Sequence, residues 1–120
     1  TRMSAGHQVD ATGTPQVSLL TYRTNLMHIF DRLASTSARV IWATTTPVGE
    51  DIAIRRNEDI DAYNLAAAEV IAQRSIAVND LHTVVRSYSS SLWSDGVHFT
   101  DEGAGRLADA VSEVIRNALQ

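Results

Sequence analysis

The chain has 120 residues, of which 44% are hydrophobic and 20% are charged, close to the average for globular proteins. A compact chain of this length buries roughly two-thirds of the surface of its unfolded form, so we expect one folded domain. The formal net charge is -4, and all ten basic residues are arginines scattered from Arg2 to Arg116. This excludes the basic stripe of a nucleic-acid-binding protein and favours a small molecule or another polypeptide as the partner.

The absence of cysteine excludes disulfides, thiolate metal sites and a cysteine nucleophile, without indicating a compartment. No apolar stretch approaches the roughly 18 residues that a membrane span needs, and no signal peptide is visible. The missing signal peptide carries little weight, because we expect a further segment before Thr1 for the reasons given below.

The first half of the chain predicts a loop, a helix and a strand. Residues 1–17 are rich in Gly, Ser, Thr and Pro and have no apolar period, so they predict a loop or N-terminal arm. Residues 18–34 carry apolar side chains at helical spacing, and Ser18 is a candidate cap. Residues 39–44 form a short, nearly continuous apolar run that predicts a strand buried on both faces. Thr45-Thr46-Pro47 ends it.

The second half predicts three helices around a second strand. Asn57 is the expected cap of a helix whose first turn is acidic. Residues 75–78 predict another buried strand, residues 80–86 a short helix, and residues 88–99 a loop. Thr100 is the expected cap of a last helix that runs to about Leu119. The expected inward face of the helix that begins near Asn57 consists of Ile60, Tyr63, Asn64, Ala67, Val70 and Ile71. That of the last helix consists of Leu107, Val111, Val114, Ile115 and Ala118.

This alternation predicts an α/β fold, a three-layer α/β/α arrangement with a central parallel sheet and right-handed crossovers. The pattern contains two good strands but four helices. Two parallel strands are too few for an independently stable sheet. We therefore expect residues 18–120 to form one part of a larger sheet domain.

The sharpest chemical signal is the segment from Ser94 to Thr100, which contains the pattern D-x-x-H. Asp95 stands three residues before His98, and Gly96 between them gives the backbone freedom for a tight reversal. The carboxylate can then accept from imidazole Nδ1–H and leave Nε2 free to take a proton from a nucleophile. The same tetrapeptide is also common in surface turns and helix caps, and no second ligand stands at metal-binding spacing nearby.

The context of this pattern resembles the SGNH (GDSL-like) hydrolase family. The run DGVHFTDEGAGRLADAVSEVI is similar to the family's last block, where D-x-x-H precedes the C-terminal helix. TYRTNLMHIFDRL, VIWATTTPV and IDAYNLAAAEVIAQRSIAVNDLH are similar to the preceding segments in the family's order. The resemblance covers residues 16–119.

The resemblance implies a carboxylic ester hydrolase with His98 as general base and acid and Asp95 as its orienting carboxylate. It implies no metal or organic cofactor. The family's nucleophile lies in a Gly-Asp-Ser segment, and its oxyanion donors include a Gly and an Asn, all before the matched region. This chain has no Gly-Asp-Ser. We therefore expect an N-terminal segment bearing the serine outside the chain, and negligible esterase activity from the chain alone.

Three further residues are candidates for substrate binding. Thr46 follows a strand at the edge where such folds bind ligands, Trp93 stands beside the D-x-x-H pattern, and Val97 lies within it. Each is also consistent with an ordinary turn or packing role. His7, His28 and His82 are interpreted as ordinary surface or helix histidines.

Two other hypotheses stay open. A truncated SGNH-like module that binds carbohydrate or protein without catalysis predicts that no serine-bearing segment is encoded. An unrelated α/β ligand-binding domain predicts that Asp95 and His98 do not hydrogen-bond.

Overall fold

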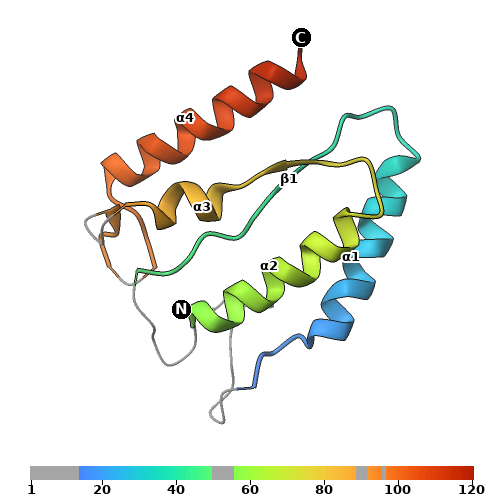
Figure 1. The fold of residues 1–120 in the computed structure, drawn as a ribbon, viewed down its shortest axis with the longest axis horizontal. Helices are drawn as coiled ribbons and strands as arrows, with labels where there is room; N and C mark the ends of the chain where they lie inside the picture. Colours follow the sequence, from blue (N-terminus) through green and yellow to red (C-terminus); the bar gives the residue numbers. More distant parts are fainter. Residues whose placement is uncertain (1–13, 50–55, 89–91, 96) are drawn as a thin grey trace.

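A computed structural model describes residues 14–49, 56–88, 92–95 and 97–120. Most of the predicted N-terminal arm, residues 1–13, lies outside this part. The described elements alternate as the sequence predicts, although both strands are shorter than expected and the second is shifted toward the C-terminus (Figure 1). In chain order they are α1 (Leu19–Ala34), β1 (Ile41–Ala43), α2 (Asn57–Ile71), β2 (Ala77–Asn79), α3 (Leu81–Arg86) and α4 (Asp101–Ala118).

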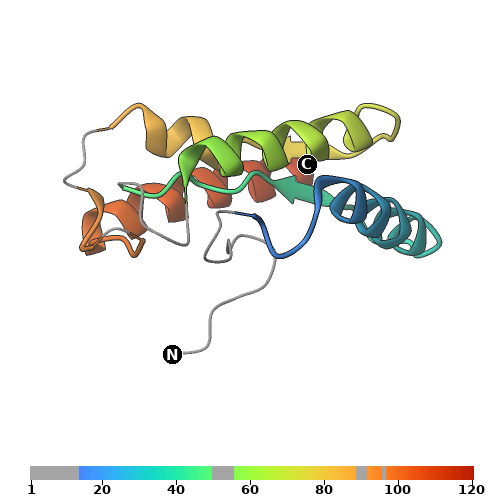
Figure 2. The same cartoon turned by 90° about the horizontal axis from the view of Figure 1, so that it is seen from below.

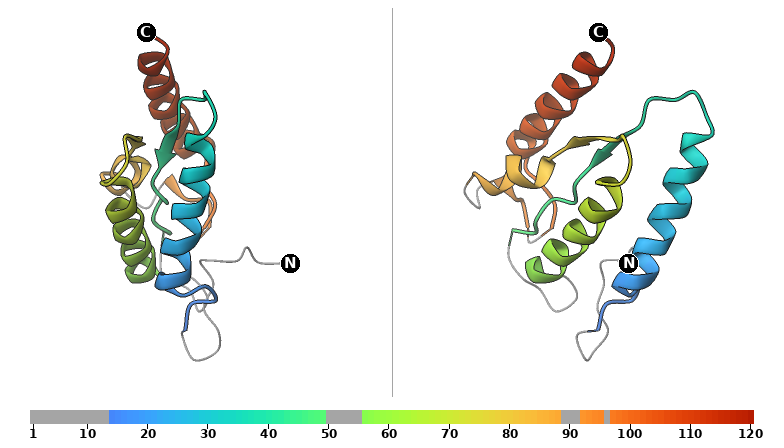
Figure 3. Two further views of the ribbon diagram at one scale, coloured as in Figure 1. Left: turned by 90° about the vertical axis from the view of Figure 1, so that its right-hand side faces the viewer. Right: turned by 45° about the vertical axis from the view of Figure 1, so that its right-hand side comes forward.

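The two strands form the centre of a layered α/β arrangement. They are parallel, with Ile41 opposite Ala77 and Ala43 opposite Asn79, and they make up the whole sheet of the described residues. Helix α4 lies on one side of the strands, and α1 and α2 lie on the other (Figure 1). Figures 2 and 3 show that α1 extends past β1 on the side away from β2. The arrangement confirms the predicted fold class.

The core lies between α1, α2 and the strands. Leu26 and Phe30 of α1 are buried against the apolar face of α2. The rings of Phe30 and Trp42 of β1 pack edge to face, with their centroids 5.6 Å apart. Burying such side chains is the main favourable term in folding. The predicted inward face of α2 is confirmed, with Ala66 added to it and Asn64 half-buried.

Helix starts follow local cap chemistry, with one exception. The hydroxyls of Ser18 and Thr100 each accept the backbone N–H three residues later, as predicted for N-caps. The expected cap at Asn57 is wrong, because α2 begins at Asn57 and Arg56 is in the cap position. The Asn57 amide instead accepts the N–H of Val48 at 3.0 Å and donates to its carbonyl at 3.1 Å.

Burial of the strands differs from the prediction. Ile41 and Trp42 are half-buried, while Ala43 and Val78 are exposed, so the described residues do not cover either strand on both faces. Among the described residues the sheet has two strands, so each strand has one edge without a partner.

Helix α4 is also less buried than its sequence pattern predicts. Leu107, Val111, Val114 and Ala118 are half-buried, and Ile115 is exposed, contrary to its expected inward position. The apolar stripe reaches beyond the short strands that it faces. None of the described helices combines the length and apolar character that a membrane crossing requires.

Candidate active site

The D-x-x-H segment lies in a small closed loop between α3 and α4. The N–H of Thr100 donates to the carbonyl of Leu92 at 2.8 Å, and the N–H of Ser94 donates to that of His98 at 2.8 Å. Trp93 and Phe99 pair between these bonds as an antiparallel bridge. Thr100 therefore closes the loop and caps α4, which fixes the loop to the start of that helix.

Asp95 is held by three donors. Its Oδ1 accepts the N–H of Val97 at 2.7 Å and the N–H of His98 at 2.6 Å, and its Oδ2 lies 2.9 Å from Nδ1 of the His98 ring. The backbone N–H of His98, the ring of His98 and the N–H of Val97 lower the pKa of Asp95 to about 2. The carboxylate is charged at neutral pH, so Nδ1 is the donor in the bond to the ring.

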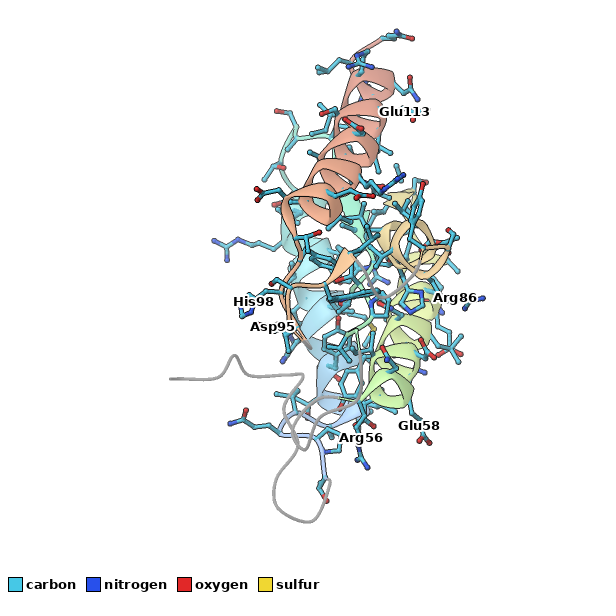
Figure 4. The ribbon with its side chains drawn as sticks, turned by 90° about the vertical axis from the view of Figure 1, so that its left-hand side faces the viewer. Arg56, Glu58, Arg86, Asp95, His98 and Glu113 are labelled. Carbon is cyan, nitrogen blue, oxygen red and sulfur yellow. The ribbon has the colours of Figure 1, made fainter. Side chains whose placement is uncertain are left out.

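The hydrogen bond between Asp95 and His98 orients the imidazole. With its proton on Nδ1, the ring carries a lone pair on Nε2 that can accept a proton. The His98 side chain is 79% exposed, and Figure 4 shows it beside Asp95 on the opposite side of the molecule from Arg86. The predicted acid–imidazole contact is therefore present, and its proton-accepting atom is open to solvent. Gly96, which the sequence predicts to allow the tight reversal, lies outside the described residues.

Among the other candidates, Val97 stands next to His98 and donates its N–H to Asp95, whereas Trp93 lines a separate cavity. Trp93 is half-buried and lines a cavity of about 330 Å³ beside Pro47, and its indole N–H is buried with no hydrogen-bond partner among the described residues. Thr46 and Val97 are half-buried, and neither they nor His98 line this cavity as far as the described residues show. The structure thus brings Asp95, Val97 and His98 together in one turn.

The same cavity contains a second acid–imidazole pair that the sequence interpretation missed. Nε2 of His82 lies 3.0 Å from Oδ1 of Asp61, and the His82 side chain is only 12% exposed. Asp61 lies near the start of α2, which follows β1, and His82 lies at the start of α3, which follows β2. Both therefore stand at the edge of the sheet where the parallel strands end. That positional signal was available in the sequence. By contrast, His28 is exposed on α1, and His7 lies outside the described residues.

No set of three or more His, Asp and Glu side chains stands close enough to bind a metal ion in the described ranges. Among the described residues, the contact of Asp95 with Nδ1 of His98 leaves Nε2 of the ring able to accept a proton.

The fold of the chain is similar to that of known proteins, although the sequence search finds no match. No protein-family model and no curated protein matches the sequence. A lipase/acylhydrolase from Enterococcus faecalis superposes with a TM-score of 0.71 and 24% identity, over 84% of this chain and 53% of that one. LAE5, an alpha/beta hydrolase from the metagenome of Lake Arreo, Spain, gives 0.64 and 20%, over 80% and 46%.

The chain spans about half the length of these solved structures. Over that span the chain has the α/β fold of these two solved structures.

Proposed function

We propose that this chain provides the His-Asp half of a serine-dependent carboxylic ester hydrolase. The observation that carries the proposal is the 2.9 Å contact between Oδ2 of Asp95 and Nδ1 of His98, with the ring open to solvent. In this mechanism Nε2 of His98 takes the proton of a serine hydroxyl as its oxygen attacks the ester carbonyl. The same proton passes to the leaving alkoxide, and His98 then activates the water that releases the acid.

Asp95 has two tasks in this mechanism. It holds the imidazole in the tautomer that keeps Nε2 unprotonated, and it stabilises the imidazolium that forms during attack. The two backbone N–H groups on Oδ1 fix the carboxylate itself, so the orientation does not depend on the ring alone. The low pKa of Asp95, about 2, keeps it charged throughout the range in which a histidine can act as a base.

The nucleophile and the oxyanion donors belong to a segment outside the 120 residues. The sequence contains no Gly-Asp-Ser, and the chain matches only about half of each solved hydrolase structure. The exposure of His98 supports the same view, because preorganised catalytic groups act most strongly where water is excluded. A covering segment would supply that exclusion.

The outer edge of β1 is the place where such a segment would add its strands. β1 pairs only with β2 among the described residues, and α1 extends beyond it with no strand beneath (Figures 2 and 3). Leu20 and Ile29 of α1 are 74% and 52% exposed, and because nine residues span two and a half helical turns, strands on one side of α1 can cover at most one of them. Additional strands next to β1 would cover apolar surface that is now open to water.

The substrate class is a carboxylic ester, without a metal or organic cofactor. Members of the family that the sequence resembles act on esters ranging from lipids and short acyl esters to acetylated sugars. Val97, small and apolar within the D-x-x-H segment, favours a short acyl group. Trp93 and Thr46 remain candidates for contacts with the substrate.

The proposal is tested by reconstitution. The chain is mixed with the segment encoded upstream of Thr1, and hydrolysis of p-nitrophenyl acetate is followed. The chain alone should give only the buffer rate, and the mixture should be active. In the mixture, Asp95→Asn should lower kcat by about 10⁴-fold and His98→Gln by at least as much, while His28→Gln on the exposed face of α1 should not change it.

Two results would contradict the proposal: an inactive mixture that contains a Gly-Asp-Ser segment, or full activity of the chain alone. If no serine-bearing segment is encoded, the non-catalytic binding module replaces the enzyme as the better interpretation.

A further inference from the structure

We propose that Trp93 is a positioning residue for the Asp95–His98 pair. Its indole packs directly against the backbone of Gly49. The contact of the indole with the turn after β1 fixes the position of the loop that carries the pair. The catalytic meaning of this role rests on the proposed function, while the positioning itself is a property of the chain alone.

The contact between Gly49 and Trp93 requires a residue without a side chain. A Cβ built on Gly49 would lie 2.8 Å from Cγ, 3.0 Å from Cδ2 and 3.1 Å from Cβ of Trp93. Carbon atoms pack at about 3.5–4.0 Å, so even a methyl group at this position displaces the indole or the turn. The Trp93 ring therefore packs directly on the backbone of the turn at Gly49.

The turn on one side of this contact is fixed to α2. The Asn64 amide accepts the N–H of Thr45 at 2.9 Å and donates to its carbonyl at 2.8 Å. Directly before Gly49, Val48 makes the same pair of bonds with the Asn57 amide. Two asparagines on one helix thus hold both ends of the turn, and Gly49 follows directly after the second.

On the other side of this contact, Trp93 is paired with Phe99 at the far end of its loop. The Trp93 and Phe99 rings lie 5.5 Å apart across the antiparallel bridge. Asp95 stands two residues after Trp93, and His98 stands one residue before Phe99. The aromatic pair therefore holds both ends of the short segment that carries the acid and the base, and a shift of Trp93 reaches both of them.

The test reads the hydrogen bonds of Asp95 in the whole chain. In Gly49→Ala, the midpoint of the Asp95 carboxyl ¹³C titration should rise from about 2 toward the ordinary value of 3.8, because the three donors lose their alignment. Far-UV circular dichroism should be unchanged. Gly105→Ala is the matched control, since a Cβ at Gly105 meets nothing within 4 Å, and it should leave the midpoint at about 2.

A double variant separates Trp93 from other effects of the added methyl group. With Trp93→Ala already present, Gly49→Ala should produce no further change in the Asp95 midpoint, because the indole that it displaces is gone. An unchanged midpoint in Gly49→Ala would overturn the proposal. An equal rise with and without Trp93 would overturn it as well, since the effect would then bypass the indole.

A variant without added bulk covers the case in which Gly49→Ala does not fold. Trp93→Leu removes the indole and should raise the Asp95 midpoint in the same direction; an unchanged midpoint would overturn the proposal. Failure of the enzyme hypothesis gives a different result. A shifted midpoint together with an inactive reconstituted mixture would retain the positioning role and remove the ester hydrolase.

Discussion

The hydroxyl of Thr44 donates to Oδ1 of Asp80 at 3.1 Å and accepts the backbone N–H of His82 at 2.9 Å. Thr44 directly follows β1, and Asp80 directly precedes α3, so one hydroxyl joins the ends of two parallel strands. Asp80 also accepts the hydroxyl of Thr83 at 2.6 Å and caps α3. This contact fixes where α3 begins, and with it the pair that His82 forms with Asp61.

Asp80→Ala should therefore lower the free energy of unfolding by about 1–2 kcal/mol, the usual cost of a lost N-cap with one further hydrogen bond. Hydrogen bonds from Thr83 are the main reason that the pKa of Asp80 lies below its ordinary value of 3.8. Its contribution is present above that value and is lost as the pH falls through the lower folded pKa. Urea denaturation measures the change. Asp109→Ala, an exposed acid within α4, should cost less than Asp80→Ala at neutral pH.

Asn64→Ala should be more costly than its partial exposure suggests. The substitution leaves the N–H and the carbonyl of Thr45 without their partner, and each part-buried group left unpaired costs about 1–3 kcal/mol. The neighbouring Leu65 is 63% exposed, so Leu65→Ala should change the free energy of unfolding by under about 0.5 kcal/mol. Equal losses in the two variants would show that the asparagine bonds do not stabilise the turn.

Acid titration should reveal the unusual carboxylate of the candidate site. The backbone N–H signals of Val97 and His98 in ¹H–¹⁵N spectra should shift with a midpoint of about 2, because both groups donate to Asp95. The folded pKa is depressed, so the stabilisation is complete above the ordinary value of 3.8 and disappears as the pH falls through about 2. In Asp95→Asn this transition should be absent. A midpoint near 3.8 would contradict the geometry.

The features that the sequence predicted correctly are those decided by near neighbours. The period of α2 gives its buried face, and the period of α1 gives Leu26 and Phe30, although Ile29 of the same predicted face is 52% exposed. The caps Ser18 and Thr100 bond to residues three positions away. The spacing of Asp95 and His98 likewise allows a tight turn to bring them together, as the sequence predicts, whereas the proposed support of that turn by Trp93 and Gly49 is not local.

Features that depend on distant neighbours could not be obtained in this way. Asn57 is a good cap by type, yet its amide bonds to Val48, which a helix-start rule does not consider. The packing of Trp93 on Gly49 joins residues 44 positions apart, and nothing local marks that glycine. Strand burial was overestimated because an apolar run indicates what a strand prefers, while its exposure depends on which neighbours are present.

Two glycines in α4 offer a comparison that separates helix propensity from packing. A Cβ at Gly103 would lie 2.6 Å from the carbonyl oxygen of Leu92 and 3.1 Å from Phe99, whereas Gly105 has open space. Gly105→Ala should raise the free energy of unfolding by about 0.5–1 kcal/mol, because alanine loses less entropy in a helix. Gly103→Ala has the same propensity gain, but overpacking costs about 1–3 kcal/mol, so its net effect should be destabilising. Thermal denaturation of both variants measures the difference. If both stabilise the chain equally, α4 does not pack closely on the loop that carries His98.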